Sequence, residues 1–173
     1  PFVAILGGAK VSDKLAVISH LLTRVDSLLL GGGMANTLLL AQGKQIGKSL
    51  AESDLVEQAR DLLSQAKEHG VSILVPSDVL VAETIDSKHA SVVSSDRVAA
   101  GTSVFDIGPE TVRAYCTHIS EARTVFWNGP MGVFEKTPFA SGTMAVAHCV
   151  ADSHAFTVVG GGDSIAAIEA AGI

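Results

Sequence analysis

The sequence PFVAILGGAK at residues 1–10 is a short apolar run that ends in two glycines. The same pattern returns three times, as LLLGGGM at 28–34, TVFWNGPMG at 124–132 and FTVVGGGDS at 156–164. In a parallel sheet such turns lie at the carboxyl ends of the strands, where glycine lets backbone N–H groups approach a phosphate and the next helix adds its positive end. Several such turns on one edge favour a nucleotide as the ligand.

Outside these turns, strand and helix patterns alternate along the chain. Short apolar runs predict strands, and apolar residues spaced by three or four predict helices. The predicted strands lie at 2–6, 27–30, 71–75, 124–127 and 155–159. The predicted helices lie at 12–24, 34–42, 52–69, 109–122, 139–152 and 164–171. Two further short strands, at 79–83 and 90–93, fit an antiparallel pairing, and 94–103 is expected to be a loop.

This alternation predicts an α/β fold. We expect a doubly wound, Rossmann-like three-layer α/β/α sandwich with a mainly parallel sheet and right-handed crossovers. The sequence has no linker rich in Pro, Ser or Gly between its elements and no low-complexity stretch. Residues 1–173 are therefore expected to form a single domain.

Charge and composition disfavour several classes of partner. With 12 basic and 18 acidic residues, the chain has a formal net charge of −6, which argues against nonspecific binding to nucleic acid or to an anionic membrane. The longest stretch without a charged residue, 27–43, contains three successive glycines, so a membrane span is not expected. No secretory signal is visible, and we expect a cytoplasmic protein.

Cys116 and Cys149 are the two cysteines, and both fall in predicted helices. One pair is too few for a disulfide scaffold, so we interpret them as buried thiols in a reducing compartment. His118 and His148 lie close to them in sequence, but neither CxxC nor HExxH spacing is present. We therefore prefer chance proximity to a zinc site.

The first glycine motif, GGAKVSDK at 7–14, places Lys10 and Lys14 four residues apart. On the first turns of a helix, two ammonium groups with this spacing share a face and can reach one phosphate group. Taken alone, the motif fits equally well a tight turn between a strand and a helix, with two solvated lysines.

Two other motifs carry polar side chains that suit a nucleotide. In GGGDS at 160–164, Asp163 and Ser164 are ordinary N-cap residues, but a carboxylate there can also hold Mg²⁺ against nucleotide oxygens, and the hydroxyl can donate to phosphate. In NGPMGVFE at 128–135, Asn128 and Glu135 accompany apolar side chains, a set that suits sugar hydroxyls and a base. A structural turn is the simpler interpretation of that motif alone.

Two familiar nucleotide motifs fail in this sequence. GKQIGKS at 43–49 resembles a Walker A loop, but it has three residues rather than four between its glycine and GK, and it follows a predicted helix. Neither GGAKVS nor GGGMAN supplies the GxGxxG fingerprint of a dinucleotide site. An NAD-type Rossmann domain and a noncatalytic binding module, in which the glycine turns are tight connections and nothing more, remain as alternatives.

Taken in order, six blocks resemble the carboxyl-terminal, nucleotide-binding domain of phosphoglycerate kinase. The blocks are GGAKVSDK, GGGMA, IGKSL, DIGPET, WNGPMGVFE and GGGDS, and the similarity spans essentially all 173 residues. Their order and spacing are far more specific than any one glycine turn. The resemblance implies reversible phosphoryl transfer between 1,3-bisphosphoglycerate and MgADP, giving 3-phosphoglycerate and MgATP in glycolysis.

The resemblance also implies roles for matching positions. Lys10 and Gly162 would be catalytic, with Lys10 stabilising the phosphoryl group during its transfer, and Asp163 would bind Mg²⁺. The positions that match nucleotide-binding residues are Gly8, Ala9, Lys10, Lys14, Gly31, Gly32, Gly33, Leu50, Val104, Phe105, Asn128, Pro130, Val133, Glu135, Gly161, Gly162, Asp163 and Ser164.

Within that set, Lys14 and Asn128 would hold phosphates and Glu135 would accept hydrogen bonds from the ribose. The adenine would lie in an apolar slot, and Val104 stands where members of the family usually carry glycine, which bears on the width of that slot. The other slot positions are Gly31, Gly32, Gly33, Leu50 and Val133, with Phe105 nearby.

The resemblance covers one half of that enzyme. Its amino-terminal domain, which binds the phosphoglycerate through a basic patch, and its final glycine-rich segment have no match in this sequence. We therefore expect a truncated product of an enzyme that is monomeric at full length. The chain should bind nucleotide in weakened form without useful turnover, because domain closure brings donor and acceptor into line. Apolar surface left uncovered should favour self-association.

Overall fold

The computed structural model describes residues 1–173 and shows strands and helices alternating along most of the chain. The strands are β1 (Phe2–Leu6), β2 (Ser27–Leu30), β3 (Ser72–Leu74), β4 (Asp78–Ala82), β5 (Ser91–Ser94), β6 (Ser103–Ile107), β7 (Thr124–Asn128) and β8 (Phe156–Gly160). The α-helices are α1 (Leu15–Leu21), α2 (Gly32–Ala41), α3 (Val56–Glu68), α4 (Pro109–Glu121), α5 (Ser141–Asp152) and α6 (Gly162–Ala170). Short 3₁₀ turns occur at Val11–Asp13, Ser53–Leu55 and Thr137–Phe139.

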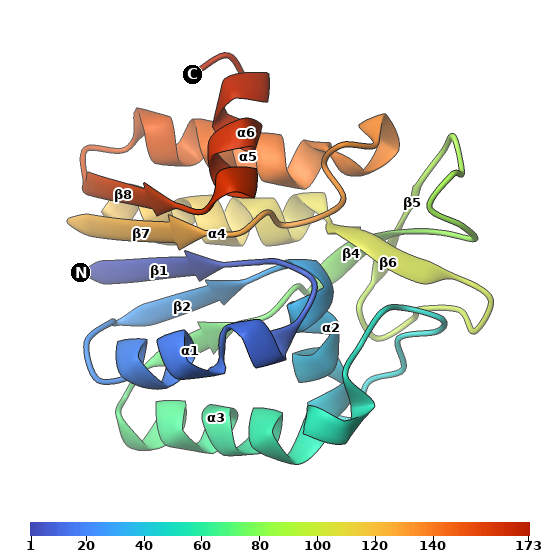
Figure 1. The fold of residues 1–173 in the computed structure, drawn as a ribbon, viewed down its shortest axis with the longest axis horizontal. Helices are drawn as coiled ribbons and strands as arrows, with labels where there is room; N and C mark the ends of the chain where they lie inside the picture. Colours follow the sequence, from blue (N-terminus) through green and yellow to red (C-terminus); the bar gives the residue numbers. More distant parts are fainter.

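Five strands form a parallel sheet in the order β3-β2-β1-β7-β8 (Figure 1). The chain moves outward from β1 to β2 and β3, and it later returns to the other side of β1 with β7 and β8. The order of winding therefore reverses between β1 and β7. In open α/β sheets, the carboxyl ends of the strands at such a reversal are the usual place for a ligand.

Helices cover both faces of this sheet, and the alternation of side chains along β1 explains how. Ala4 and Leu6 belong to the buried cluster that includes residues of α1, α2 and α3. Val3 and Ile5 belong to the cluster that includes residues of α4, α5 and α6. Successive strand residues point to opposite faces, so one fully apolar strand supplies both cores. The expected doubly wound, three-layer α/β/α fold is confirmed.

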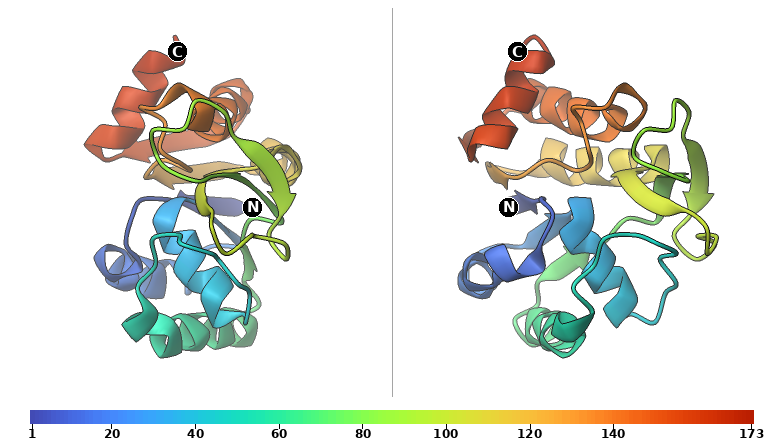
Figure 2. Two further views of the ribbon diagram at one scale, coloured as in Figure 1. Left: turned by 90° about the vertical axis from the view of Figure 1, so that its right-hand side faces the viewer. Right: turned by 45° about the vertical axis from the view of Figure 1, so that its right-hand side comes forward.

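A second, smaller sheet contains three antiparallel strands in the order β5-β4-β6. It lies beyond the carboxyl ends of the parallel strands, whose arrows point toward it in Figure 1, and Figure 2 shows it from that side. The predicted antiparallel strands correspond to β4 and β5. β6 was not predicted from the sequence, because Asp106 interrupts its apolar run and its pairing with β4 is not a local feature.

The helix predicted at 12–24 is shorter than expected. A 3₁₀ turn occupies Val11–Asp13, and α1 covers Leu15–Leu21. The helices predicted at 52–69 and 139–152 likewise begin with short 3₁₀ turns before α3 and α5. No helix in the structure is long and apolar enough to cross a membrane.

The interpretation of the cysteines as buried free thiols is wrong. Cys116 on α4 and Cys149 on α5 are half-buried and form a disulfide across 33 residues of sequence. The two helices pack against the same face of the large sheet, which brings the two Cα atoms to 5.6 Å. Spacing along the chain could not reveal this pair, because the approach of α4 to α5 is a tertiary contact.

Candidate functional site

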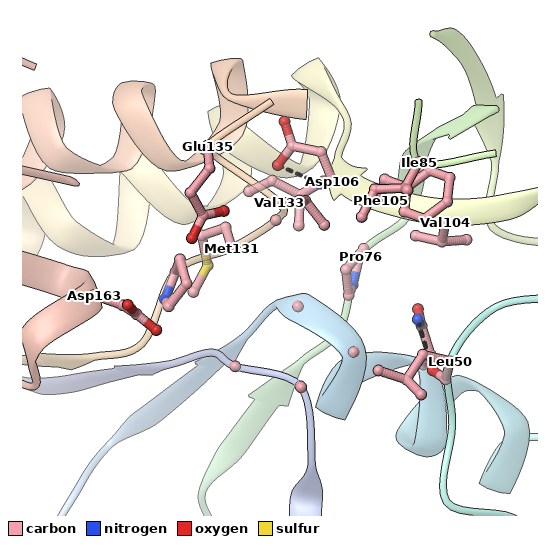
Figure 3. Close-up of a pocket in the computed structure, with 18 residues that line it drawn as sticks. Leu50, Pro76, Ile85, Val104, Phe105, Asp106, Met131, Val133, Glu135 and Asp163 are labelled. Atoms are coloured by element: carbon pink, nitrogen blue, oxygen red, sulfur yellow. Dashed lines mark hydrogen bonds between the residues drawn. The ribbon is translucent and has the colours of Figure 1, made fainter. Parts of the chain in front are cut away.

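A cavity of about 380 Å³ lies between the carboxyl ends of the parallel strands and the small antiparallel sheet (Figure 3). Its wall combines glycine loops, apolar side chains and three carboxylates. The lining residues are Gly8, Ala9, Gly32, Gly33, Asn36, Leu50, Pro76, Ile85, Val104, Phe105, Asp106, Ile107, Pro130, Met131, Gly132, Val133, Glu135 and Asp163.

The loops that follow β1 and β7 lie against each other at the point where the winding reverses. The backbone N–H of Gly7 donates to the carbonyl of Asn128 at 3.0 Å, and the N–H of Gly8 donates to the carbonyl of Pro130 at 3.2 Å. A Cβ atom on Gly7 would lie 2.0 Å from the Pro130 oxygen. Glycine is therefore required there by contact with the neighbouring backbone.

The loop after β2 packs onto the same place. Gly32 has a φ of +71°, and a Cβ atom on it would lie 2.5 Å from the carbonyl oxygen of Gly8. A Cβ on Gly31 would meet the Met131 sulfur at 2.6 Å, so Gly31 lies behind the wall rather than on it. Three glycine turns thus form one continuous floor, as the repeated motif predicted.

Lys14 contacts the β7 loop directly, because its Nζ donates a hydrogen bond to the Oδ1 of Asn128. Burial lowers the pKa of Lys14, and the nearby Asp13 carboxylate partly offsets that effect. Neither Lys14 nor Asn128 lines the cavity itself; both lie just beyond the glycine floor. The structure therefore places a cation at the carboxyl end of β7, close to the cavity.

Lys10 is exposed and also lies outside the cavity wall, next to the lining residue Ala9. The pKa of Glu52 is lowered, chiefly by the hydrogen bond that the Ser12 N–H donates to its carboxylate at 2.9 Å, with a smaller contribution from the charge of Lys10. Lys10 is thus free to turn toward solvent at the cavity edge.

The loop from β8 into α6 completes the polar side of the cavity. Asp163 lines the wall, and Figure 3 shows it on the same side of the cavity as Met131 and Glu135. The buried hydroxyl of Ser164 accepts a hydrogen bond from the N–H of Gly129 at 2.7 Å. Ser164 therefore holds the β7 turn in place. Gly161, with a φ of +90°, packs beside Asn128, and Gly162 begins α6; both lie outside the wall.

The opposite side of the cavity is apolar. Val104 and Phe105 come from β6, and the Phe105 ring packs against Phe139 with ring centroids 4.8 Å apart. Leu50 faces them from the loop after α2 and is 58% exposed. Its backbone oxygen accepts a hydrogen bond from the buried Asn36 side chain at 3.1 Å. Together these residues form a slot open to solvent.

Asp106 lies at the back of this wall and is 2% exposed. Burial raises the pKa of its carboxyl group to about 7, although hydrogen bonds from Gly142, Ile107 and Ser141 oppose the shift. The group stays in a buried position because those donors satisfy its oxygens.

The GKS-containing segment at 43–49 forms a loop after α2, as predicted. The N–H of Lys48 donates to the carbonyl of Thr102 at 2.8 Å, and the Ser49 hydroxyl accepts from the N–H of Val104 at 2.8 Å. These contacts fasten the loop to the start of β6. Its role in the structure is to place Leu50, which follows it directly, opposite the small sheet.

The structure therefore brings the predicted residues together at one edge of the large sheet, where some line the cavity and others lie next to it. On the wall are Gly8, Ala9, Gly32, Gly33, Leu50, Val104, Phe105, Pro130, Val133, Glu135 and Asp163. Off the wall are Lys10, Lys14, Gly31, Asn128, Gly161, Gly162 and Ser164.

Seven lining residues were not predicted: Asn36, Pro76, Ile85, Asp106, Ile107, Met131 and Gly132. Met131 and Gly132 fall inside the motif NGPMGVFE and could have been found there. Pro76 follows β3, where no glycine motif marked the turn, and Ile85 reaches the cavity from the loop between β4 and β5 of the small sheet.

These features define a class: a doubly wound α/β protein with a glycine-floored cavity where the order of winding reverses. The particular family follows from comparison. The sequence profile of the family described as phosphoglycerate kinase matches residues 1–173. The chain belongs to the phosphoglycerate kinase family.

Relatives and solved structures agree. The chain is 57% identical to the phosphoglycerate kinase of Herpetosiphon aurantiacus and 55% identical to that of a Roseiflexus species, in each case over 100% of this chain and 44% of the relative. The structure of phosphoglycerate kinase from Coxiella burnetii superposes with a TM-score of 0.97 at 45% identity, over 99% of this chain and 45% of that one. For the enzyme of Pyrococcus horikoshii, the TM-score is 0.85 at 36% identity, over 98% of this chain and 44% of that one. The chain thus spans a little less than half the length of these relatives.

Proposed function

We propose that this chain is the carboxyl-terminal, nucleotide-binding part of a phosphoglycerate kinase, and that its cavity binds MgADP and MgATP. In the whole enzyme, the reaction would transfer a phosphoryl group between 1,3-bisphosphoglycerate and ADP, giving 3-phosphoglycerate and ATP in cytoplasmic glycolysis. One observation carries the proposal: glycine loops, a carboxylate and an apolar slot share one cavity at the reversal of winding.

The polar end of the cavity suits phosphates. Glycine loops allow close approach of a polyanion to the backbone, and the start of α6 adds the positive end of a helix. Lys14 lies beside this end through its bond to Asn128, and its partial burial strengthens its attraction for a phosphate. Lys10, at the cavity edge, is proposed to stabilise the phosphoryl group during transfer.

The apolar end suits an adenine ring. Leu50 and Val104 form opposing surfaces of the slot, and Val133 lies between this slot and the polar end. Glu135 lies on the same segment as Val133, where its carboxylate can accept hydrogen bonds from ribose hydroxyls. Val104, which stands where members of the family usually carry glycine, contributes its branched side chain to the wall of this slot.

Asp163 is the proposed ligand of Mg²⁺. No group of three or more His, Cys, Asp or Glu side chains in the structure could hold a metal. The proposal for Asp163 is supported by its place on the cavity wall, because Mg²⁺ in a phosphate site is usually bound by one or two carboxylates together with substrate phosphates and water. When bound, Mg²⁺ would neutralise phosphate charge that develops during transfer.

Isothermal titration calorimetry with MgADP tests the proposal. We expect the chain to bind MgADP and not NAD, and we expect Lys14→Ala to weaken MgADP binding about tenfold, because it removes a charge-assisted contact to phosphate. Lys67→Ala, an exposed lysine at the end of α3, is the matched control and should bind like the unchanged chain.

Three outcomes would contradict the proposal. Tighter binding of NAD would favour a dinucleotide domain, and a failure to bind any nucleotide would favour a noncatalytic module. Near-normal kinase turnover by the 173-residue chain alone would contradict the assignment of the phosphoglycerate site to another part of the enzyme.

A further inference from the structure

The side chain of Asp106 on β6 accepts hydrogen bonds from Ser141 and Gly142 at the start of α5 and from its own neighbour Ile107. Its Oδ2 accepts a hydrogen bond from the N–H of Gly142 at 2.8 Å, and the hydroxyl of Ser141 lies 3.4 Å from the same oxygen. Its Oδ1 accepts from the N–H of Ile107 at 2.9 Å (Figure 3). Both oxygens are thus satisfied, and the two bonds to Oδ2 attach β6 to the start of α5.

The segment between β7 and α5 closes around this carboxylate at both of its ends. A Cβ atom on Gly132, near the start of the segment, would lie 2.5 Å from Asp106 Oδ1. A Cβ on Gly142, just after its end, would lie 2.3 Å from the same oxygen. Asp106 therefore fills the space that the two glycines leave free, and it fixes the distance between them.

Val133 and Glu135 lie within this closed segment, and both line the cavity. The N–H of Val133 donates to the carbonyl of Phe105 at 2.9 Å, so the segment is also tied to β6 beside Asp106. Glu135 itself is exposed, and no hydrogen bond to its carboxylate holds it from the cavity side. Its position depends on the backbone that carries it.

We infer that Asp106 is a positioning residue for the nucleoside end of the ligand: it closes the segment 132–142 and so holds Val133 and Glu135 against the slot. This inference rests on the proposed function. Asp106 does not need to touch the ligand, because it acts through the segment that it closes.

The small sheet contains a matched carboxylate that serves as a control. Asp78 on β4 is 5% exposed, and its oxygens accept hydrogen bonds from the N–H groups of Glu110 at 3.0 Å and Thr111 at 2.8 Å, at the start of α4. A Cβ on Gly108 would lie 2.3 Å from the Asp78 carboxyl carbon. Asp78 therefore repeats the structural role of Asp106, but it does not line the cavity.

The experiment compares Asp106→Asn with Asp78→Asn in this 173-residue chain at pH 8. Each amide keeps one acceptor oxygen and turns an NH₂ group toward a backbone N–H, so both variants should lose stability. Calorimetry is done at a temperature at which circular dichroism shows each variant to be folded. We expect Asp106→Asn to raise the Kd for MgADP about tenfold and Asp78→Asn to leave it within about twofold.

A second ligand distinguishes the positioning of the nucleoside-binding residues from a general loss of order in the cavity. Inorganic tripolyphosphate with Mg²⁺ carries the polar end of the ligand without the nucleoside, so its Kd should be the same for Asp106→Asn and the unchanged chain. If both ligands are weakened equally, or if Asp106→Asn and Asp78→Asn weaken MgADP equally, the inference is overturned.

Should Asp106→Asn fail to fold, Gly142→Ala replaces it. The added methyl group displaces the carboxylate without removing its charge, and Gly108→Ala is the control that displaces Asp78. The expected contrast in MgADP affinity is the same, and equal affinities for the two alanine variants would contradict the inference. If the unchanged chain does not bind MgADP, the proposed function fails and this inference fails with it.

Discussion

The two sheets of this molecule obtain their stability in different ways. The parallel sheet is covered on both faces, and its two cores contain clusters of 17 and 14 buried residues. The antiparallel sheet has a cluster of three buried residues, Val79, Val81 and Val98, and its edge strand β5 is largely exposed. The first sheet can therefore act as a rigid frame, whereas the second depends on its attachments to that frame.

This difference matches the two ends of the cavity. The parallel sheet supplies the glycine loops and Asp163, which need fixed backbone positions. The antiparallel sheet supplies Val104 and Phe105, whose apolar surfaces tolerate small movements. The parallel sheet therefore fixes the phosphate end of the proposed site, and the attached antiparallel sheet positions the base end.

The sharpest test of the comparison is to remove a buried side chain from each sheet. Trp127→Ala should lower the free energy of unfolding by about 4 kcal/mol, because Trp127 is fully buried in the frame and its indole N–H donates to the carbonyl of Gly129 at 2.7 Å. Val81→Ala in the small cluster should cost about 2 kcal/mol. Urea denaturation of both variants measures the difference, and equal losses would remove the distinction between frame and attachment.

The disulfide offers a second test, confined to the frame. Replacing Cys116 and Cys149 with serine should lower the free energy of unfolding by about 3 kcal/mol, since the bond closes a long loop in the unfolded chain. Urea denaturation with and without reductant provides the measurement, and the double variant should be insensitive to reductant. MgADP affinity should not change. An unchanged unfolding midpoint on reduction would mean that the bond does not constrain the chain.

The unfolding free energy should depend on pH through Asp106, which attaches β6 of the small sheet to α5. Its folded pKa of about 7 lies above the ordinary value of 3.8, so the folded protein holds this proton more tightly than the unfolded chain does. The resulting stability is fully present below about pH 4 and is lost as the pH rises through 7. Between about pH 5 and pH 7, we expect the unfolding free energy to fall by about 2 kcal/mol more than in Asp106→Asn. If the unfolding free energy changed with pH in the same way for both proteins, the raised pKa of Asp106 would be contradicted.

The smallest effect is expected at a surface contact between the two regions. Lys136, after β7, forms an ion pair with Asp86, after β4, at 3.2 Å, and the two side chains are 48% and 80% exposed. Lys136→Ala should cost less than about 0.5 kcal/mol, and the difference should vanish in about 1 M salt. Thermal melts at low and high salt check this. A larger, salt-independent loss would show that this contact holds the small sheet to the frame.

The frame was largely predictable from sequence. The predicted strand at 2–6 coincides with β1, and that at 27–30 coincides with β2, because a short apolar run before a glycine turn is a local signal. β6 was missed because Asp106 in the run SVFDI reads as a surface residue, whereas the structure buries it with donors from α5. Local sequence patterns predict a strand well when its side chains are apolar, and they fail when a polar side chain such as Asp106 is buried by a partner far away in the sequence.

The candidate site divides along the same line. The glycine motifs correctly indicated that Gly8, Gly32 and Asp163 lie at the cavity, because each of these residues sits in a turn formed by residues adjacent to it in sequence. It did not find Ile85, because the hairpin that carries this side chain reaches the cavity by the packing of one sheet against another. That the Ser164 hydroxyl donates to a phosphate stays a prediction; in the structure its oxygen accepts a hydrogen bond from the N–H of Gly129.

The sequence by itself determined the alternation of strands and helices and the glycine turns that follow the strands, since both are signalled by residues close together in the chain. The pairing of β1 with β7, which sets the order of winding, is a tertiary contact. Tertiary structure alone decided the bond between Cys116 and Cys149, the burial of Asp106, and the meeting of an apolar slot with a polar floor. Each of these joins elements far apart in sequence. Their positions follow from how helices and sheets pack as bodies, which no local pattern encodes.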